Sequence, residues 1–113
     1  MASLRMEKVD KHIQRTFGNI IASEARLPAN ALVTISSVDT DPNLRSSRVW
    51  LSVLPVEDGE ETLAMVQEQM YELQGSFNRA IHMKPLPRLV LRLDKGAEYA
   101  AGIERKFAEL ASE

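Results

Sequence analysis

The sequence contains no cysteine, no long apolar run and no excess of one sign of charge. Without cysteine the chain can form no disulfide, thiolate nucleophile or cysteine-ligated zinc site, so its stability must come from packing. No segment approaches the ~18 consecutive apolar residues of a membrane span, and the N-terminal residues lack the apolar stretch of a secretory signal. We therefore expect a cytoplasmic protein with no membrane contact.

The overall charge is nearly balanced, since 16 acidic and 14 basic residues leave a net charge of −2. This total gives no indication of a nucleic-acid partner, but the distribution along the chain is uneven. Residues 57–73 carry six acids and no lysine or arginine, whereas residues 78–95 carry five basic residues and one acid. This asymmetry predicts one acidic and one basic surface.

Motifs that would carry chemistry are also missing. The two histidines, His12 and His82, have no partner at metal-ligand spacing, and no phosphate-binding loop or dinucleotide fingerprint occurs. The acidic turn at residues 39–43 resembles the opening of a calcium loop, but Leu44 stands at its required glycine position. We expect no enzymatic activity, no cofactor, no metal ion and no small-molecule substrate.

The N-terminal region predicts one amphipathic helix, from Leu4 to about Glu24. Its apolar residues recur at intervals of three and four, which gives the helix one core-facing side. These residues are Met6, Val9, Ile13, Phe17, Ile20 and Ile21. Basic side chains gather on roughly the opposite side, and this stripe is either an ordinary solvated face or a binding surface. Its members are Arg5, Lys8, Lys11, His12 and Arg15.

Two short strands follow, at residues 32–38 and 48–54, each with the period-two alternation of a half-buried strand. The residues expected to face the core are Val33, Ile35, Val49, Leu51 and Val53. The turn between the strands is built on Asp41-Pro42-Asn43 and predicts an antiparallel hairpin. Trp50 lies on the opposite strand face, where it either stacks an RNA base or is covered by a helix or the C-terminal residues.

A second helical pattern follows the acidic stretch, with apolar positions at Leu63, Val66, Met70, Leu73, Phe77 and Ala80. Gly75 falls inside this pattern and predicts a kink or a break into two helices. Pro85 and Pro87 end the helix, a third strand begins near residue 89, and Asp94 is expected to cap a closing helix near residues 96–110.

These elements predict an α+β fold in a single domain, residues 1–113. Three strands offer one apolar face, and the helices supply matching apolar stripes. A two-layer sandwich, with the helices packed on one face of a three-stranded sheet, satisfies both. The expected order is helix, strand, strand, bent helix, strand, helix, with the other face of the sheet partly exposed.

Several segments, taken in order and spacing, resemble a known family. They are the helix ending near Ile20-Ile21, the strand Val33-Thr34-Ile35-Ser36-Ser37-Val38, the strand Ser47-Arg48-Val49-Trp50-Leu51-Ser52-Val53, and the basic segment Arg79-Ala80-Ile81-His82-Met83-Lys84 with Pro87-Arg88-Leu89. They are similar to segments of ribosome-binding factor A, a bacterial assembly factor of the small ribosomal subunit with a KH-like (type II) fold. The resemblance covers most of the chain.

The sequence departs from this family at the bend between the two central helices. The family usually carries Ala-x-Gly there, and an ungapped count back from Pro87 reaches Gln69-Met70-Tyr71 instead. Either the bend has moved to Gly75, or the chain is a divergent member. The Gly-x-x-Gly loop with which ordinary KH domains clamp nucleic-acid backbone is also missing.

The resemblance implies a non-catalytic factor that binds the small (30S) ribosomal subunit and its rRNA. It implies a role in late subunit maturation and in processing of precursor 16S rRNA, notably in the cold. We expect a monomer whose basic side chains contact phosphates. The candidate residues are Arg5, Lys8, Lys11, Arg15, Arg45, Arg48, Arg79, His82, Lys84 and Arg88. The alternatives are a KH-like RNA-binding module unrelated to ribosome assembly, or a protein-interaction adaptor.

Overall fold

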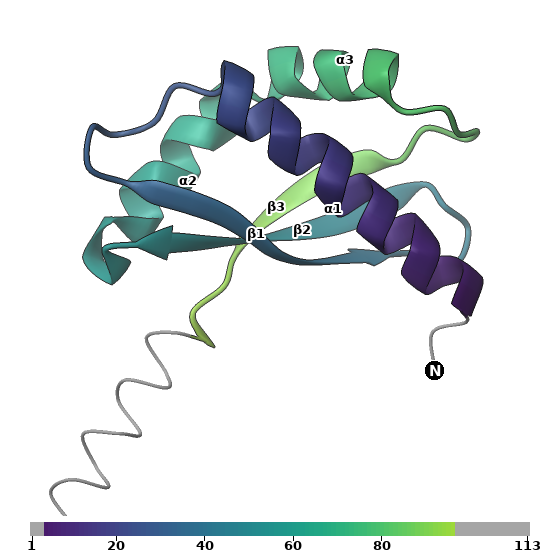
Figure 1. Ribbon diagram of the computed structural model, residues 1–113, viewed down its shortest axis with the longest axis horizontal. Helices are drawn as coiled ribbons and strands as arrows, with labels where there is room; N and C mark the ends of the chain where they lie inside the picture. The colour runs from purple at the N-terminus through teal and green to yellow at the C-terminus, as the bar shows by residue number, and fades with distance from the viewer. Residues whose placement is uncertain (1–3, 97–113) are drawn as a thin grey trace, which may run out of the picture.

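The computed structural model (Figure 1) describes residues 4–96 of the chain. Its elements are α1 (Leu4–Glu24), β1 (Leu32–Thr40), β2 (Ser46–Leu54), the 3-10 helix η1 (Val56–Asp58), α2 (Gly59–Glu68), α3 (Met70–Ala80) and β3 (Arg88–Leu93). This order confirms the sequence prediction as far as β3. The expected closing helix lies outside the described residues, apart from its start, where the Gly96 amide donates to Asp94 Oδ1 at 2.8 Å.

The three strands form one sheet in the order β1-β2-β3, with β2 in the centre. β1 and β2 pair antiparallel as a hairpin, whereas β3 pairs parallel with β2 after the α2–α3 crossover. Figure 1 shows α1, α2 and α3 on the same side of the sheet. The predicted two-layer α+β sandwich is therefore confirmed.

The hydrophobic core lies between the helices and the sheet. Its members from α1 and α3 include Ile13, Phe17 and Phe77, all fully buried. The two phenylalanine rings meet edge to face, with their centroids 6.1 Å apart. The sheet contributes the alternating residues of β2, among which Val49 and Leu51 are fully buried. The periodicity of α1 and β2 thus selects the core residues that the structure buries, although Met6 and Val9 of the predicted stripe are only half-buried.

β1 contains a bulge that the sequence alternation did not predict. Ile35 pairs with Leu51 but Ser37 pairs with Trp50, so Ser36 is an extra residue. Because a bulge shifts the side-chain alternation by one, Val38 joins the same core as the half-buried Val33 and Ile35. β1 therefore runs on to Thr40, and the turn begins later than expected.

The hairpin turn uses the predicted Asp41-Pro42-Asn43 segment. The Leu44 amide donates to the Asp41 carbonyl at 2.8 Å, and the Arg45 amide donates to Asn43 Oδ1 at 3.0 Å. Leu44 adopts a φ of 61°, in the left-handed region that closes such turns. Arg45 is consequently held at the tip of the hairpin.

The central helical segment breaks at Gln69, so the predicted kink at Gly75 is wrong. Gln69 is buried and lies between α2 and α3, with φ of −96° and ψ of 1°. Its side chain accepts from the Arg26 amide at 2.7 Å and donates to the carbonyls of Arg26 and Met65 at 2.8 and 2.9 Å. Side-chain hydrogen bonds thus support the bend, at the ungapped position of the family's Ala-x-Gly segment, while Gly75 lies inside α3.

No helix within residues 4–96 combines the length and the apolar character that crossing a membrane requires.

Candidate nucleic-acid interface

The basic stripe of α1 is turned outward because the other flank of the helix is tied to β1. Asp10 Oδ1 accepts from the Thr40 amide at 3.0 Å, and Gln14 Nε2 donates to the Ile35 carbonyl at 2.8 Å, beside the bulge. These contacts fix the rotation of the helix about its axis. The stripe is consequently turned toward solvent, and each of its members is exposed: Arg5, Lys8, Lys11, His12 and Arg15.

The α3–β3 loop, residues 81–87, carries two further candidates on a firmly held backbone. Ile81 and Pro87 are buried and anchor its two ends. Gln74 of α3 donates to the Pro87 carbonyl at 3.1 Å and accepts from the Leu89 amide at 2.9 Å. The loop therefore presents His82 and Lys84 to solvent from fixed positions.

The loop and α1 meet around a surface hollow of about 530 Å³. Arg5, Lys8 and His12 line it from α1, and His82 and Met83 line it from the loop. Because positions three and seven residues apart follow one side of a helix, the three α1 side chains form a continuous edge. We call this feature the basic hollow. It joins two segments that are about seventy residues apart in the chain.

Arg45 and Arg88 lie side by side at the neighbouring end of the sheet. The Arg88 amide donates to the Arg45 carbonyl at 2.9 Å, which places the hairpin tip against the start of β3. Both side chains are exposed. In Figure 1 the N-terminal half of α1, the hairpin turn and the α3–β3 loop all lie at the right-hand end of the molecule.

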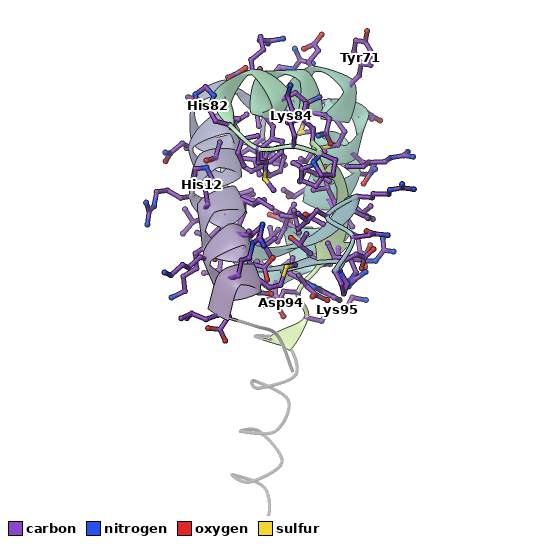
Figure 2. The ribbon with its side chains drawn as sticks, turned by 90° about the vertical axis from the view of Figure 1, so that its right-hand side faces the viewer. His12, Tyr71, His82, Lys84, Asp94 and Lys95 are labelled. Carbon is purple, nitrogen blue, oxygen red and sulfur yellow. The ribbon has the colours of Figure 1, made fainter. Side chains whose placement is uncertain are left out.

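We call this end of the molecule the basic end. Its members are Arg5, Lys8, Lys11, His12, Arg45, His82, Lys84 and Arg88. Figure 2 looks onto it, with His12 on α1 and with His82 and Lys84 on the loop. Within residues 4–96, the ion pairs join Arg48 to Asp39 and Asp41, and Lys95 to Glu60, so none involves a member of the basic end.

Arg48 differs from the other candidates because two carboxylates hold it. Its guanidinium lies 2.6 Å from Asp39 Oδ2 and 3.0 Å from Asp41 Oδ1. The hydrogen bonds to both carboxylates raise the pKa of Arg48 above its ordinary value, so it remains protonated but locally neutralised. Its structural role is to fasten the turn to β2, and we leave it out of the proposed interface.

Arg15 and Arg79 lie outside the basic hollow. Arg15 lines a separate groove between α1 and β1, together with Gly18 and Val33. Arg79 Nη2 donates to Ser76 Oγ at 3.2 Å, and that hydroxyl donates to Glu24 Oε1 at 2.7 Å. Arg79 therefore points toward an acid at the other end of α1.

His12 lines the basic hollow but is not among the phosphate contacts predicted from the sequence. It was noted in the α1 stripe, but only the folded structure brings it to His82 across the hollow. Its spacing of seven residues from Arg5 was the available signal, since this spacing returns to the same side of a helix.

The other features that the sequence singled out, Trp50 and the acidic stretch, do not belong to the basic end. Trp50 is half-buried on the sheet face opposite the helices, with the buried Val49 and Leu51 on either side of it in sequence. Among residues 4–96 no group of three histidine, aspartate or glutamate side chains is arranged to hold a metal ion. The acidic residues of η1 and the start of α2 lie at the left-hand end of Figure 1, opposite the basic end.

Comparison with known proteins agrees with this fold. A curated relative from Bdellovibrio bacteriovorus, named ribosome-binding factor A, is 30% identical over 110 residues, which cover 96% of this chain and 82% of the relative. One from Rubrobacter xylanophilus with the same name is 27% identical over 113 residues, covering 100% of this chain and 93% of the relative.

A crystal structure and a fitted homology model share the architecture. The crystal structure of ribosome-binding factor A from Thermus thermophilus aligns with a TM-score of 0.66 at 20% identity, over 78% of this chain and 94% of that one. A homology model of the Thermus thermophilus protein has been fitted into a cryo-EM map of its 30S complex. It aligns with a TM-score of 0.59 at 23% identity, over 76% of this chain and 91% of that one.

The family model described as ribosome-binding factor A matches residues 5–107, which span the elements from α1 to β3 except for the first residue of α1. This chain belongs to the ribosome-binding factor A family.

Proposed function

We propose that this protein binds the small ribosomal subunit through its basic end and assists late maturation of the 30S particle, including processing of precursor 16S rRNA. The observation that carries the proposal is the convergence of the α1 stripe with the α3–β3 loop, free of ion pairs within the described residues. Family membership and the 30S complex of the Thermus thermophilus homologue support the choice of partner.

The proposed mechanism is differential binding without catalysis. Exposed lysine and arginine side chains replace counterions along rRNA phosphates, which makes the affinity strongly dependent on salt. A protein that binds one rRNA arrangement better than another shifts the population toward it. The proposal includes a monomer, a cytoplasmic site of action and a particular need for the factor in the cold, where misfolded rRNA rearranges slowly.

The first test compares two lysines that differ in their environment. Lys8 lines the basic hollow, whereas Lys95 pairs with Glu60 at 3.2 Å, next to the acidic residues of α2. We expect Lys8→Ala to weaken binding to immature small subunits and to reduce the slope of log affinity against log salt by about one. Lys95→Ala should leave both quantities unchanged. The measurement is a binding titration at several salt concentrations.

Three outcomes would contradict the proposal. A salt slope that Lys8→Ala leaves unchanged would favour the protein-interaction adaptor. Equal binding to mature ribosomes and to immature subunits would remove the role in assembly. A failure to co-sediment with immature subunits would leave only a KH-like RNA-binding module unrelated to ribosome assembly.

A further inference from the structure

The basic hollow contains apolar side chains, one of which, Leu4, packing of the core does not account for. Leu4, Val9 and Met83 line it beside the cationic and imidazole groups. Val9 and Met83 pack against the hydrophobic core, so their positions are fixed. Leu4, by contrast, is 68% exposed on the first turn of α1. A purely phosphate-binding surface has no use for apolar groups at this place.

The arrangement of charge around the hollow favours an anionic ligand with a flat apolar part. Arg5 and Lys8 border it, and no carboxylate is among its lining residues. His12 and His82 add two planar rings from two different elements. Unstacked nucleotides are recognised in this way, with the base against an aromatic or imidazole ring and apolar groups, and the phosphate against basic side chains.

The size of the hollow also fits. Its volume of about 530 Å³ lies within the range of roughly 300–1,000 Å³ that is usual for small-ligand sites. The bases of a double helix cannot enter such a space, because they are stacked and paired. A single unstacked nucleotide is small enough to enter it.

We propose that the basic hollow binds one unstacked nucleotide of a single-stranded RNA segment, with the base against His82, Met83 and Val9 and its phosphate against Arg5 and Lys8. This inference rests on the proposed rRNA-binding function and adds a contact to a base. Base contacts differ from phosphate contacts in one measurable respect. They contribute affinity that does not depend on salt, whereas each phosphate contact adds to the salt slope.

The test uses two single-stranded RNA oligomers of equal length, one of mixed sequence and one with abasic ribose phosphates throughout. We expect His82→Ala to lower affinity for the mixed oligomer about fivefold or more, with an unchanged salt slope. The same variant should change affinity for the abasic oligomer by less than about twofold. His82→Phe keeps a flat ring and should retain the affinity of the unmodified protein for the mixed oligomer.

A matched control separates this site from exposed aromatic rings in general. Tyr71 of α3 is 93% exposed and does not line the hollow, so Tyr71→Ala should leave both affinities unchanged. Equal losses on the two oligomers after His82→Ala, or equal affinity of the unmodified protein for both, would overturn the nucleotide site and leave phosphate binding intact. Binding to neither oligomer, with retained binding to immature subunits, would overturn the nucleotide site alone. Loss of binding to all three would overturn the proposed function as well.

Discussion

Gln69 is the residue on which the bend between α2 and α3 depends. It is 8% exposed, and all three of its side-chain hydrogen bonds go to backbone groups, two on Arg26 and one on Met65. A helix break leaves amide and carbonyl groups without helical partners, and burial makes such groups costly. The Gln69 side chain therefore pairs one carbonyl of α2 and ties the bend to the segment between α1 and β1.

We expect Gln69→Ala to lower the free energy of unfolding by about 2–3 kcal/mol, because it removes three hydrogen bonds that a buried side chain makes to Arg26 and Met65. Urea denaturation followed by circular dichroism measures this change. Gln67→Ala is the matched control, since Gln67 is exposed on the same turn of α2 and should change stability by less than about 0.5 kcal/mol. Equal stability of the two variants would show that the bend does not need the Gln69 contacts.

At this scale the sequence predicts buried apolar residues well and buried polar residues poorly. Periodicity selected Ile13, Phe17 and Leu51, because a side chain's face follows from its position in a helix or strand. The role of Gln69 depends on Arg26, 43 residues away, and no local pattern contains that information. The same limit applies to Arg48, whose carboxylate partners are defined by hairpin register.

Among the elements, α3 departs most from the sequence prediction, since it continues through Gly75 without a break. Gly75 lies in a regular part of this helix, and an added Cβ would meet only Arg79 Nη1, at 3.4 Å. Because that group ends a flexible side chain, it can move aside. Glycine is less favourable than alanine in a helix interior by about 0.5–1 kcal/mol.

We therefore expect Gly75→Ala to raise the free energy of unfolding by about 0.5–1 kcal/mol in thermal or urea denaturation. Gly59→Ala is the contrasting variant, because its Cβ would meet the Leu93 side chain at 3.1 Å inside a packed contact. That change should cost about 1 kcal/mol. A destabilised Gly75→Ala variant would show that the helix does need glycine at this position.

The sequence predicts the ends of an element well where its periodicity is regular. α1, for example, runs over the expected residues Leu4–Glu24. The bulge at Ser36 was missed because two adjacent serines fit either face of a strand. The break at Gln69 was missed for a related reason, since glycine is the usual indication of a break and Gln69 has good intrinsic helix propensity. Only the ungapped register from Pro87 indicated the correct position.

For the whole molecule, the separation of charge defines an orientation. The basic end and the acidic residues of η1 and α2 lie at opposite ends in Figure 1. A surface rich in phosphates attracts one end and repels the other. On the proposed function, the protein should therefore dock with the α3–β3 loop toward the rRNA and with α2 away from it.

The absence of cysteine makes this orientation easy to measure, because a single introduced cysteine carries a cross-linker at one known place. Leu86→Cys lies on the exposed part of the α3–β3 loop, and Glu61→Cys lies on the first turn of α2. On immature small subunits we expect the first to cross-link to rRNA at least about fivefold more efficiently than the second. Comparable yields, or the reverse order, would contradict the orientation.

The basic end itself could be predicted only in part. The α1 stripe and the basic segment after α3 were visible separately, but their meeting around one hollow is a result of tertiary packing. Long-range convergence of this kind leaves no trace in local spacing. That residues 1–113 make up a single domain stays a proposal, since the described residues end at 96.

The central position of β2 has a consequence for synthesis of the protein. β2 finds β1 across a short turn, but it finds β3 only after residues 55–87 have been made. Strands that are close in sequence pair quickly, whereas strands separated by a long segment pair only after that segment has been synthesised. A nascent chain whose β3 has not yet been made can therefore pair β1 with β2 only, and the second strand of this marginally stable hairpin lacks its parallel neighbour.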